Sequence, residues 1–391
     1  MSNVSFKNII IAISLVLLGI QTSLYKGYGD DLDSHSLILS FISAYENGVY
    51  SSSRFYGSPF GELFYGYIGY NFGSFLGSFL SYCFFLFSII LIFSSYSKNK
   101  INQKDLFLFV LICLSNPVLY LDNTNPSDYP LSLFLFSAAL FLFKKNYKIY
   151  SIIFFALAIA TRANFALLII VFLIYEIFKN KKDYKISLLV LFYSLVISSL
   201  FYFPIFIQNK YSLSFINNGG GPDLTFESLT PRFLYKSYLS IGVFSSIYVL
   251  FLLSSNFNKV KKLISINKDL IILIFLNLLV FYFMPTKTSI ISLALMLFYV
   301  FLFKLVDKKI YIYSIIFLNF LFYIVSYQLF DFKYKYQGKC DPKEAIGAEF
   351  SFKVSQGYYF KRTEIMKNQI YCASKQLGEN FQKYINGSRI K

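Results

Sequence analysis

Residues 149–178 read IYSIIFFALAIATRANFALLIIVFLIYEIF, an apolar run with Arg162 near its middle. A single helix of this length would bury Arg162 near the centre of a bilayer and separate the lysine-rich flanks. A hairpin of two helices, 149–161 and 163–178, puts both flanks on one side and Arg162 at the turn. These arms reach about 20–24 Å at 1.5 Å per residue, whereas the hydrocarbon core is about 30 Å thick. We therefore predict a hairpin whose turn lies slightly below the outer surface, in a protein-lined recess.

The whole chain has the composition of an all-α, multi-pass membrane protein. Of its 391 residues, 56% are hydrophobic and 15% are charged, and the mean hydropathy is +0.54. Several uninterrupted apolar runs have membrane-spanning length. The first run, 9–24, lacks an Ala-x-Ala-type cleavage site, so we expect a retained helix rather than a cleaved signal peptide.

The positions of the basic residues that give the net charge of +17 indicate the membrane topology. Lysines cluster in short loops near residues 98–104, 144–148, 179–185, 259–268 and 304–309. By the positive-inside rule these loops are cytoplasmic, so the charge implies no nucleic-acid partner. The predicted spans are 8–25, 74–97, 105–121, 128–143, 149–161, 163–178, 186–207, 238–256, 269–285, 288–305 and 309–328. They make about 11 transmembrane helices, with the N-terminus inside and the C-terminus outside.

The outer side then receives the loops 26–73 and 208–237, the turns at Arg162 and Lys287, and every arginine of the chain. Arginine binds a carboxylate or phosphate as a rigid fork, which lysine cannot imitate. At Arg162 two interpretations remain open. It is a site for a lipid phosphate, or it snorkels to the interface or pairs with Asp128.

The outer loop 26–73 begins with three carboxylates in four positions, Asp30, Asp31 and Asp33. Carboxylates clustered at a membrane boundary repel one another, so such a cluster suggests a binding partner or a function. This favours a catalytic role. The alternative is a charged N-terminal cap for the amphipathic helix that follows. Apolar residues at helical spacing predict that this interfacial helix ends near Gly48. Ser58-Pro59 predicts the start of a second one.

Four short motifs follow in order along the predicted outer face. They are the string Ser53, Arg54, Gly57, Pro59 and Glu62, the segment Asn125-Pro126-Ser127-Asp128-Tyr129-Pro130-Leu131, the turn Ala160-Thr161-Arg162-Ala163, and Met284-Pro285-Thr286-Lys287. Together with a first helix followed by an Asp motif, they resemble the GT-C superfamily of membrane glycosyltransferases, particularly bacterial mannosyltransferase-like members. The resemblance covers roughly residues 1–330. Family members often carry a single Asp or Asp-Glu, so three Asp leave the catalytic one ambiguous.

The resemblance implies an enzyme that transfers a sugar from a polyprenyl-phosphate donor to a glycan, lipid or protein acceptor in one inverting displacement. Asp31 is the first choice for general base, followed by Asp30 and Asp33. The implied substrate-binding residues are Arg54, Glu62, Asp128, Arg162 and Lys287, with a cation stabilising the leaving phosphate. No metal site or cofactor is expected, although a divalent metal stays open. The implied location is the cell (inner) membrane, with the active site on the extracytoplasmic side, in cell-envelope glycan biosynthesis.

The chain divides into a transmembrane GT-C-like domain, 1–329, and a small extracytoplasmic tail, 330–391. Cys340 and Cys372 are the only cysteines outside the predicted spans, and the oxidising side favours a disulfide between them. Two rival functions remain. The loop 208–237 keeps an O-antigen-type polymerase or ligase open as an alternative function. A lipid-linked saccharide flippase or transporter would usually show charges well inside the bundle.

Overall fold

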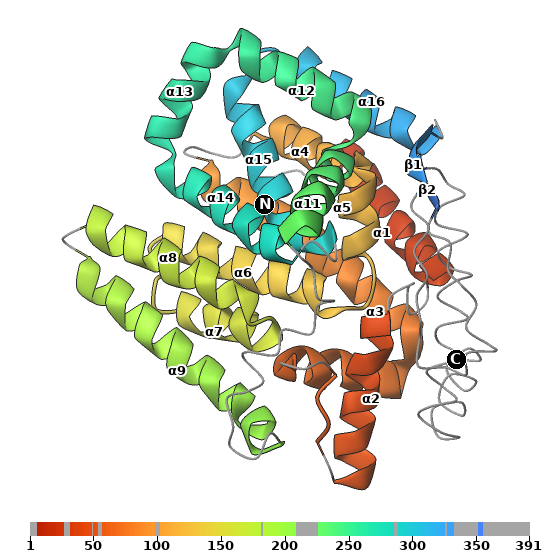
Figure 1. The fold of residues 1–391 in the computed structure, drawn as a ribbon, viewed down its shortest axis with the longest axis vertical. Helices are drawn as coiled ribbons and strands as arrows, with labels where there is room; N and C mark the ends of the chain where they lie inside the picture. Colours follow the sequence, from red (N-terminus) through yellow and green to blue (C-terminus); the bar gives the residue numbers. More distant parts are fainter. Residues whose placement is uncertain are drawn as a thin grey trace.

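The computed structural model describes residues 6–26, 32–48, 50–53, 57–97, 102–180, 183–208, 226–284, 288–324, 327–331 and 351–354. Its elements, labelled in Figure 1, are α1 (Phe6–Lys26), α2 (Leu32–Asn47), α3 (Pro59–Tyr96), α4 (Gln103–Ser115), α5 (Pro117–Asn123), α6 (Asp128–Lys144), α7 (Ser151–Thr161), α8 (Asn164–Lys179), α9 (Tyr184–Gln208), α11 (Phe226–Ile241), α12 (Val243–Ser255), α13 (Phe257–Ile266), α14 (Lys268–Phe283), η1 (Thr288–Ile291), α15 (Ser292–Leu305), α16 (Ile310–Ile324), β1 (Tyr327–Asp331) and β2 (Ser351–Val354). Within the described residues as far as Ile324, the predicted helical architecture is confirmed.

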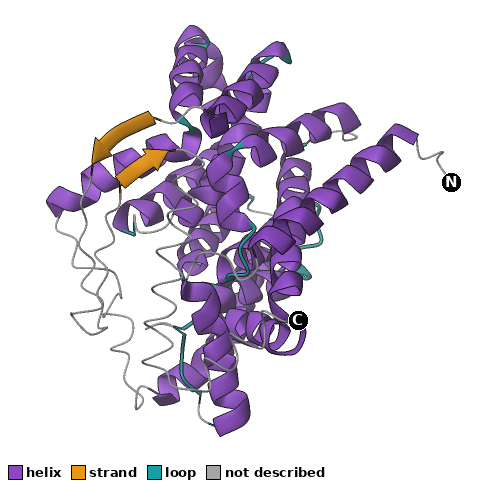
Figure 2. Ribbon diagram, turned by 90° about the vertical axis from the view of Figure 1, so that its right-hand side faces the viewer, coloured by secondary structure: helices purple, strands orange, loops and turns teal. Residues whose placement is uncertain are grey.

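The tail contributes a short antiparallel pair of strands, which the all-α prediction missed. Tyr327 lies opposite Val354, and Gln328 lies opposite Lys353. Figure 2 shows the pair at the edge of the helical body. Aromatic and β-branched residues in these segments favour strands, but a pairing across more than twenty residues is not readable from local pattern. Cys340 and Cys372 lie outside the described residues.

Three helices of the described chain are long and apolar enough to cross a membrane: Phe75–Tyr96, Tyr184–Ile207 and Thr288–Leu305. A fourth candidate is the pair α13 and α14, which are bent by 96° at Asn267. Five shorter apolar helices, among them Ser151–Thr161 and Ile310–Leu321, add to these. This content is compatible with a membrane protein.

Every predicted span falls mainly on helix, although the span 309–328 extends past the end of α16 at Ile324 into β1. Two other spans are broken by residues that end helices. The span 105–121 is divided at Asn116, where Pro117 starts α5. The span 238–256 is divided at Gly242, whose φ of 91° is left-handed. The second half of the predicted loop 208–237 is also helical, because α11 begins at Phe226. Its first half lies outside the described residues.

Asn116 satisfies backbone groups at both of these breaks. It is fully buried, and its Oδ1 accepts the Leu119 N–H at 2.9 Å at the start of α5. Its Nδ2 donates to the Ser240 carbonyl, in the last turn of α11, and to the Tyr299 hydroxyl, both at 2.8 Å. A break among apolar helices is tolerated only when the freed backbone groups find such partners.

The segment 149–178 forms two helices broken at Arg162, as predicted. Lys148, just before α7, forms an ion pair with Asp183, just after α8, at 2.8 Å. The two ends of the segment are therefore together, and the helices are antiparallel. The prediction of a hairpin is confirmed.

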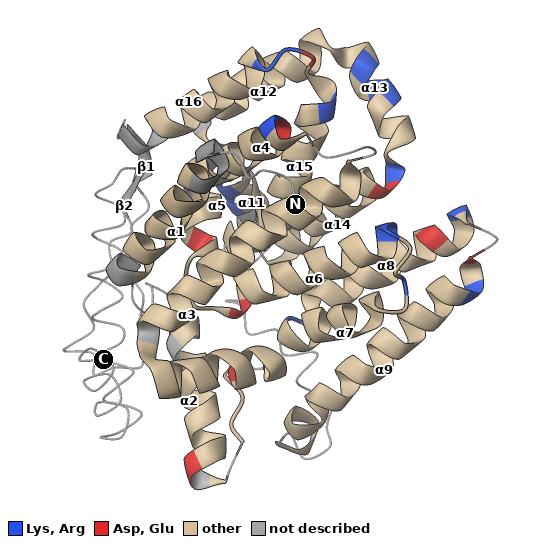
Figure 3. Ribbon diagram, turned by 180° about the vertical axis from the view of Figure 1, so that it is seen from behind, with Lys and Arg blue, Asp and Glu red and all other residues tan. Residues whose placement is uncertain are grey.

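The predicted basic loops meet one another through ion pairs. Lys144 pairs with Asp269, Lys309 with Asp105 and Lys259 with Asp307. Figure 3 shows Lys and Arg residues at the ends of α8, α13 and α14. This common location is what the positive-inside rule requires of loops on one side.

Buried phenylalanines fix α6 against the hairpin. Phe136 of α6 contacts Phe155 of α7 and Phe165 of α8, with ring centroids 6.0 and 5.3 Å apart. Phe143 contacts Phe172 at 5.5 Å. Close packing of this kind permits little displacement. It therefore holds the turn at Arg162 in one place relative to the start of α6.

Candidate functional site

The predicted site residues are described to different extents. The side chains of Glu62, Asp128 and Arg162 are described. For Asp33 only the backbone is described, as the second residue of α2. Outside the described residues lie Asp30, Asp31, Arg54 and Lys287.

The start of α2 bears on the acidic cluster. The helix begins at Leu32 and ends at Asn47, and Gly48 follows with φ 64°, as predicted for an amphipathic helix in this loop. Asp33 is therefore in the first turn, where a carboxylate interacts favourably with the helix dipole. The capping interpretation remains open beside the catalytic one.

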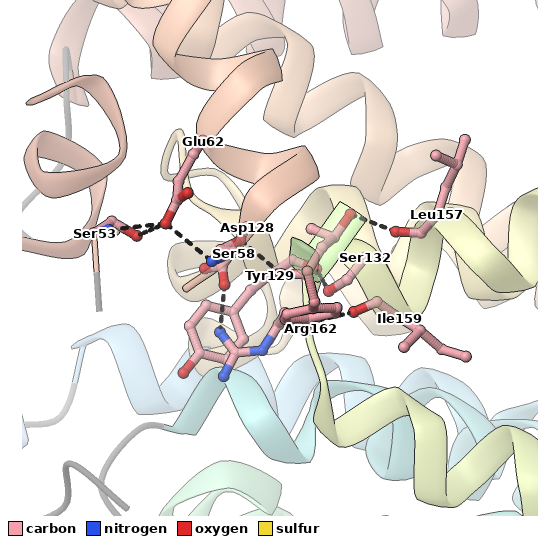
Figure 4. A network of polar contacts seen from close by, with 11 residues as sticks. Ser53, Ser58, Glu62, Asp128, Tyr129, Ser132, Leu157, Ile159 and Arg162 are labelled. Carbon is pink, nitrogen blue, oxygen red and sulfur yellow. Dashed lines mark hydrogen bonds and ion pairs between the residues drawn. The ribbon is translucent and has the colours of Figure 1, made fainter. Parts of the chain in front are cut away.

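Arg162 forms the turn between α7 and α8 (Figure 4). Its backbone is extended, with φ −148° and ψ 114°, and its N–H donates to the Ala158 carbonyl at 2.9 Å. Its Nη1 lies 2.9 Å from Asp128 Oδ2, and its guanidinium carbon lies 3.5 Å from the centre of the Tyr129 ring. The pairing with Asp128 left open above is therefore present in the structure, and the site for a lipid phosphate stays a prediction.

This ion pair is almost completely removed from solvent. The Asp128 side chain is 1% exposed and the Arg162 side chain 11%. Asp128 is the first residue of α6, where the positive end of the helix dipole also favours a carboxylate. Because charges at this depth are costly unless they are paired, each partner stabilises the other. Tyr129 was not predicted as a site residue, and its position next to Asp128 was the only available signal.

A small cavity, with room for about one water molecule, lies beside the guanidinium, between α6, α8, α14 and α15. Its polar lining comprises Tyr129, Ser132, Arg162, Asn164, Asn277, Ser289 and Ser292. Within the described part of the chain, Arg162 Nε and Asn164 Oδ1 are buried without a hydrogen-bond partner. An unpaired buried donor and acceptor are each costly, so this place favours a polar ligand or water.

The first motif, in the loop 26–73, is held together by Glu62, which is 2% exposed. Its Oε1 accepts the Ser53 N–H at 2.8 Å, the Ser53 hydroxyl at 2.6 Å and the Ser58 N–H at 2.9 Å. Its Oε2 accepts the hydroxyl of Tyr50. Burial, and then the Glu62 charge, raise the pKa of Tyr50 above its ordinary value, so the phenol stays protonated as a donor. These contacts make Glu62 a positioning residue for the loop, and its predicted contact with substrate stays a prediction.

Ser58 connects this loop to the turn that carries Arg162. It is the N-cap residue of α3, as predicted, but its hydroxyl does not cap the helix. It donates instead to the Thr161 carbonyl at 2.6 Å. The hydrogen bonds from Glu62 through Ser58 to Thr161 therefore join the loop 26–73 to the turn that carries Arg162.

Two glycines permit this close approach. Gly57 has φ 65°, and a Cβ there would lie 2.2 Å from Ile205 Cδ1. A Cβ on Gly61 would lie 2.5 Å from Ser58 Oγ and 3.1 Å from Asp128 Cβ. Gly61 was not singled out in the sequence, because only the packing of α3 against α6 makes its missing side chain necessary.

The fourth motif borders the same cavity. Lys287 itself is not described, but Thr288 follows it and donates a hydrogen bond to Asp122 of α5. Ser289, the next residue, and Ser292, one turn further on, line the cavity beside Arg162. Segments from three of the four motifs, and the flank of the fourth, therefore surround one place. Among the described residues, no group of three or more His, Cys, Asp or Glu side chains is arranged to hold a metal ion.

We expect Glu62→Ala to lower the free energy of unfolding by about 2 kcal/mol, because buried N–H and O–H donors of the loop lose their acceptor. Thermal unfolding in detergent measures the change. Glu46→Ala is the matched control, since Glu46 is exposed on α2 in the same loop 26–73 and, among the described residues, accepts a hydrogen bond from Tyr70. Its effect should stay within about 0.5 kcal/mol. Equal effects of the two substitutions would contradict the positioning role of Glu62.

Comparisons with protein-family models, with curated proteins and with solved structures found no match for this chain.

Proposed function

We propose that the chain is an integral-membrane glycosyltransferase that moves a sugar from a polyprenyl-phosphate donor to an extracytoplasmic acceptor by inverting displacement. The observation that carries this proposal is the buried Arg162–Asp128 pair, joined through Ser58 to the loop that begins with the acidic cluster. An arginine held at a fixed place beside a polar cavity suits a phosphate that gains charge as it leaves. The eleven-span topology, with this face outside, is part of the proposal.

Each residue has a role in this chemistry. Asp31, or else Asp30 or Asp33, takes the proton of the acceptor hydroxyl as general base. Arg162 meets the donor phosphate with the edge of its guanidinium that includes Nε, because Asp128 already occupies Nη1. A sugar hydroxyl beside Arg162 and Asn164 accepts from one group and donates to the other. Arg54 and Lys287 supply further positive charge.

Reconstituted protein, incubated with radiolabelled polyprenyl-phosphate sugars and extracted envelope acceptors, tests the activity. We expect label to move to an acceptor, and we expect deletion of the gene to remove the corresponding sugar from lipid-linked or surface glycans by mass spectrometry. Unchanged glycans, together with no transfer from any polyprenyl-phosphate sugar, would contradict the proposal.

A lipid-linked saccharide flippase is a second candidate, and the broken helices favour it. The helices are broken at Asn116 and Gly242, and buried polar side chains bridge these breaks. Broken helices of this kind are common around the substrate paths of transporters. A flippase would move a fluorescent lipid-linked sugar between leaflets of a vesicle without forming a glycosylated product. Transfer of the sugar without leaflet exchange would exclude it. A polymerase or ligase would instead join preassembled saccharides.

The sidedness of the site is tested by accessibility labelling of single cysteines. We expect Ser52→Cys, Asn217→Cys and Ser388→Cys to react with an impermeant maleimide in intact cells, because the lysine-rich loops take the opposite side. Ser265→Cys is the matched control, since Ser265 is exposed on α13 among the lysines and should react only after permeabilisation. Labelling of Ser265→Cys in intact cells would contradict this topology.

A further inference from the structure

Helix α13 differs from the other helices around it. Its ten residues read FNKVKKLISI, and none of them is buried. It turns away from α14 by 96° at Asn267. Figure 1 shows it at the margin of the molecule, between α12 and α14. The sequence predicted only a basic loop here.

One face of α13 is apolar over its whole length. Val260 and Leu263 are half-buried against the core. Phe257 and Ile264 lie beside them, seven residues apart and hence on nearly the same face, and are 57% and 42% exposed. Lys261 lies between these two, with its Nζ 4.6 Å from the centre of the Phe257 ring. The exposed apolar strip therefore carries an ammonium group that reaches along it.

The charged residues of α13 itself are all lysines, and the first carboxylate after them is Asp269 of α14. Lys259, Lys261, Lys262 and Lys268 lie on α13 or at the start of α14, and α13 has no carboxylate. Lys259 pairs with Asp307 at 2.7 Å. Lys261 and Lys262 are exposed, and neither forms an ion pair with a described residue. Basic residues flanking an exposed apolar strip are typical of helices that lie in the interface of an anionic bilayer.

We infer that α13 lies in the headgroup region on the lysine-rich side of the membrane and binds anionic phospholipid through Lys261 and Lys262. Phe257 and Ile264 enter the acyl boundary. The bend of 96° between α13 and α14 lets α13 run along the membrane surface while α14 runs into the membrane. This inference rests on the membrane location proposed above, but not on glycosyl transfer.

The chain contains no tryptophan, so a single introduced tryptophan is a fluorescent probe without background. The test substitution is Ile264→Trp. Asn258→Trp is the matched control on the polar face of the same helix, where Asn258 is exposed. Phe192→Trp, at a 59% exposed position of α9 in a candidate span, is the lipid reference. Each variant is placed in lipid nanodiscs and quenched by brominated lipid or by aqueous iodide.

We expect brominated lipid to quench Ile264→Trp about as strongly as Phe192→Trp, and iodide to quench mainly Asn258→Trp. In mixed nanodiscs, brominated phosphatidylglycerol should quench Ile264→Trp more than brominated phosphatidylcholine at equal mole fraction. Adding Lys261→Gln and Lys262→Gln should remove this excess. Each lysine near an anionic membrane surface strengthens the attraction to anionic lipid by about fivefold in the equilibrium constant.

Quenching of Ile264→Trp by iodide to the level of Asn258→Trp, while Phe192→Trp is quenched by lipid, would overturn the inference and leave the membrane location intact. That result would also be found if α13 instead bound an acidic soluble protein. An excess of phosphatidylglycerol quenching that survives both lysine substitutions would overturn the lipid-binding role. Failure of lipid to quench Phe192→Trp would overturn the membrane location itself.

Discussion

Replacing Asp31 with asparagine is expected to reduce sugar transfer by about 10²-fold or more, because the substitution preserves shape and removes the general base. The measurement is the initial rate of transfer from the polyprenyl-phosphate sugar in reconstituted vesicles. Asp30→Asn and Asp33→Asn are measured in parallel, and the variant with the largest loss identifies the base. The unfolding temperature of each variant is compared with that of the parent protein.

The acidic cluster has a second interpretation that the same experiment separates. If these carboxylates only stabilise the start of α2, each asparagine should lower stability slightly and leave the rate unchanged, because asparagine is itself a good N-cap residue. Full activity in all three variants would leave only this capping role. In that case the proposal of a base in this cluster would be wrong.

Asp128→Ala is expected to lower the free energy of unfolding by about 3–5 kcal/mol, because it leaves the Arg162 charge buried without its partner. Arg162→Ala strands the Asp128 carboxylate in the same way. The double substitution should cost less than the sum of the two single ones, since it removes both charges. Unfolding by steric trapping in lipid gives all three values.

The matched control is an exposed pair in the same protein. Lys259 and Asp307 lie 2.7 Å apart, but their side chains are 33% and 88% exposed. Asp307→Ala should therefore change the free energy of unfolding by no more than about 0.5 kcal/mol. Strictly additive costs at Asp128 and Arg162 would contradict a direct interaction between the two.

Arg162→Ala also tests the proposed function. Loss of the guanidinium should weaken binding of the polyprenyl-phosphate donor by more than the loss of folded protein accounts for. A rise in KM for the donor, at a temperature where the variant stays folded, is the expected result. Arg162→Lys keeps the charge and loses the planar fork, so it should restore only part of the affinity. Full activity in both variants would contradict the proposal that Arg162 binds the donor phosphate.

The helices were largely predictable because their signals are local. Apolar runs located the segments, Ser58-Pro59 marked the start of α3, and Gly48 marked the end of α2. The break at Arg162 followed from the length of the run and the sign of its flanks. The break at Gly242 and the separate helix α13 were missed, because composition alone does not report bends between helices of similar hydropathy.

The contacts of the site were less accessible to sequence. The pairing of Arg162 with Asp128 was one of two open interpretations, and the roles of Glu62 and Gly61 were not derivable from spacing. Ser58 bonds to Thr161 across 103 positions of the chain. A hydrogen bond of this range depends on how α3 and the hairpin pack against α6.

The sequence by itself determined that this chain is a bundle of apolar helices whose basic loops share one side, because hydropathy and charge act on each segment independently. Only the tertiary structure decided that Arg162 is neutralised by Asp128 and borders a cavity with polar side chains in its lining, and that Glu62 holds its own loop. Burial is the physical reason. A charge or a hydrogen-bonding group finds its partner among the groups that packing brings within about 3 Å, and packing is a property of the whole chain.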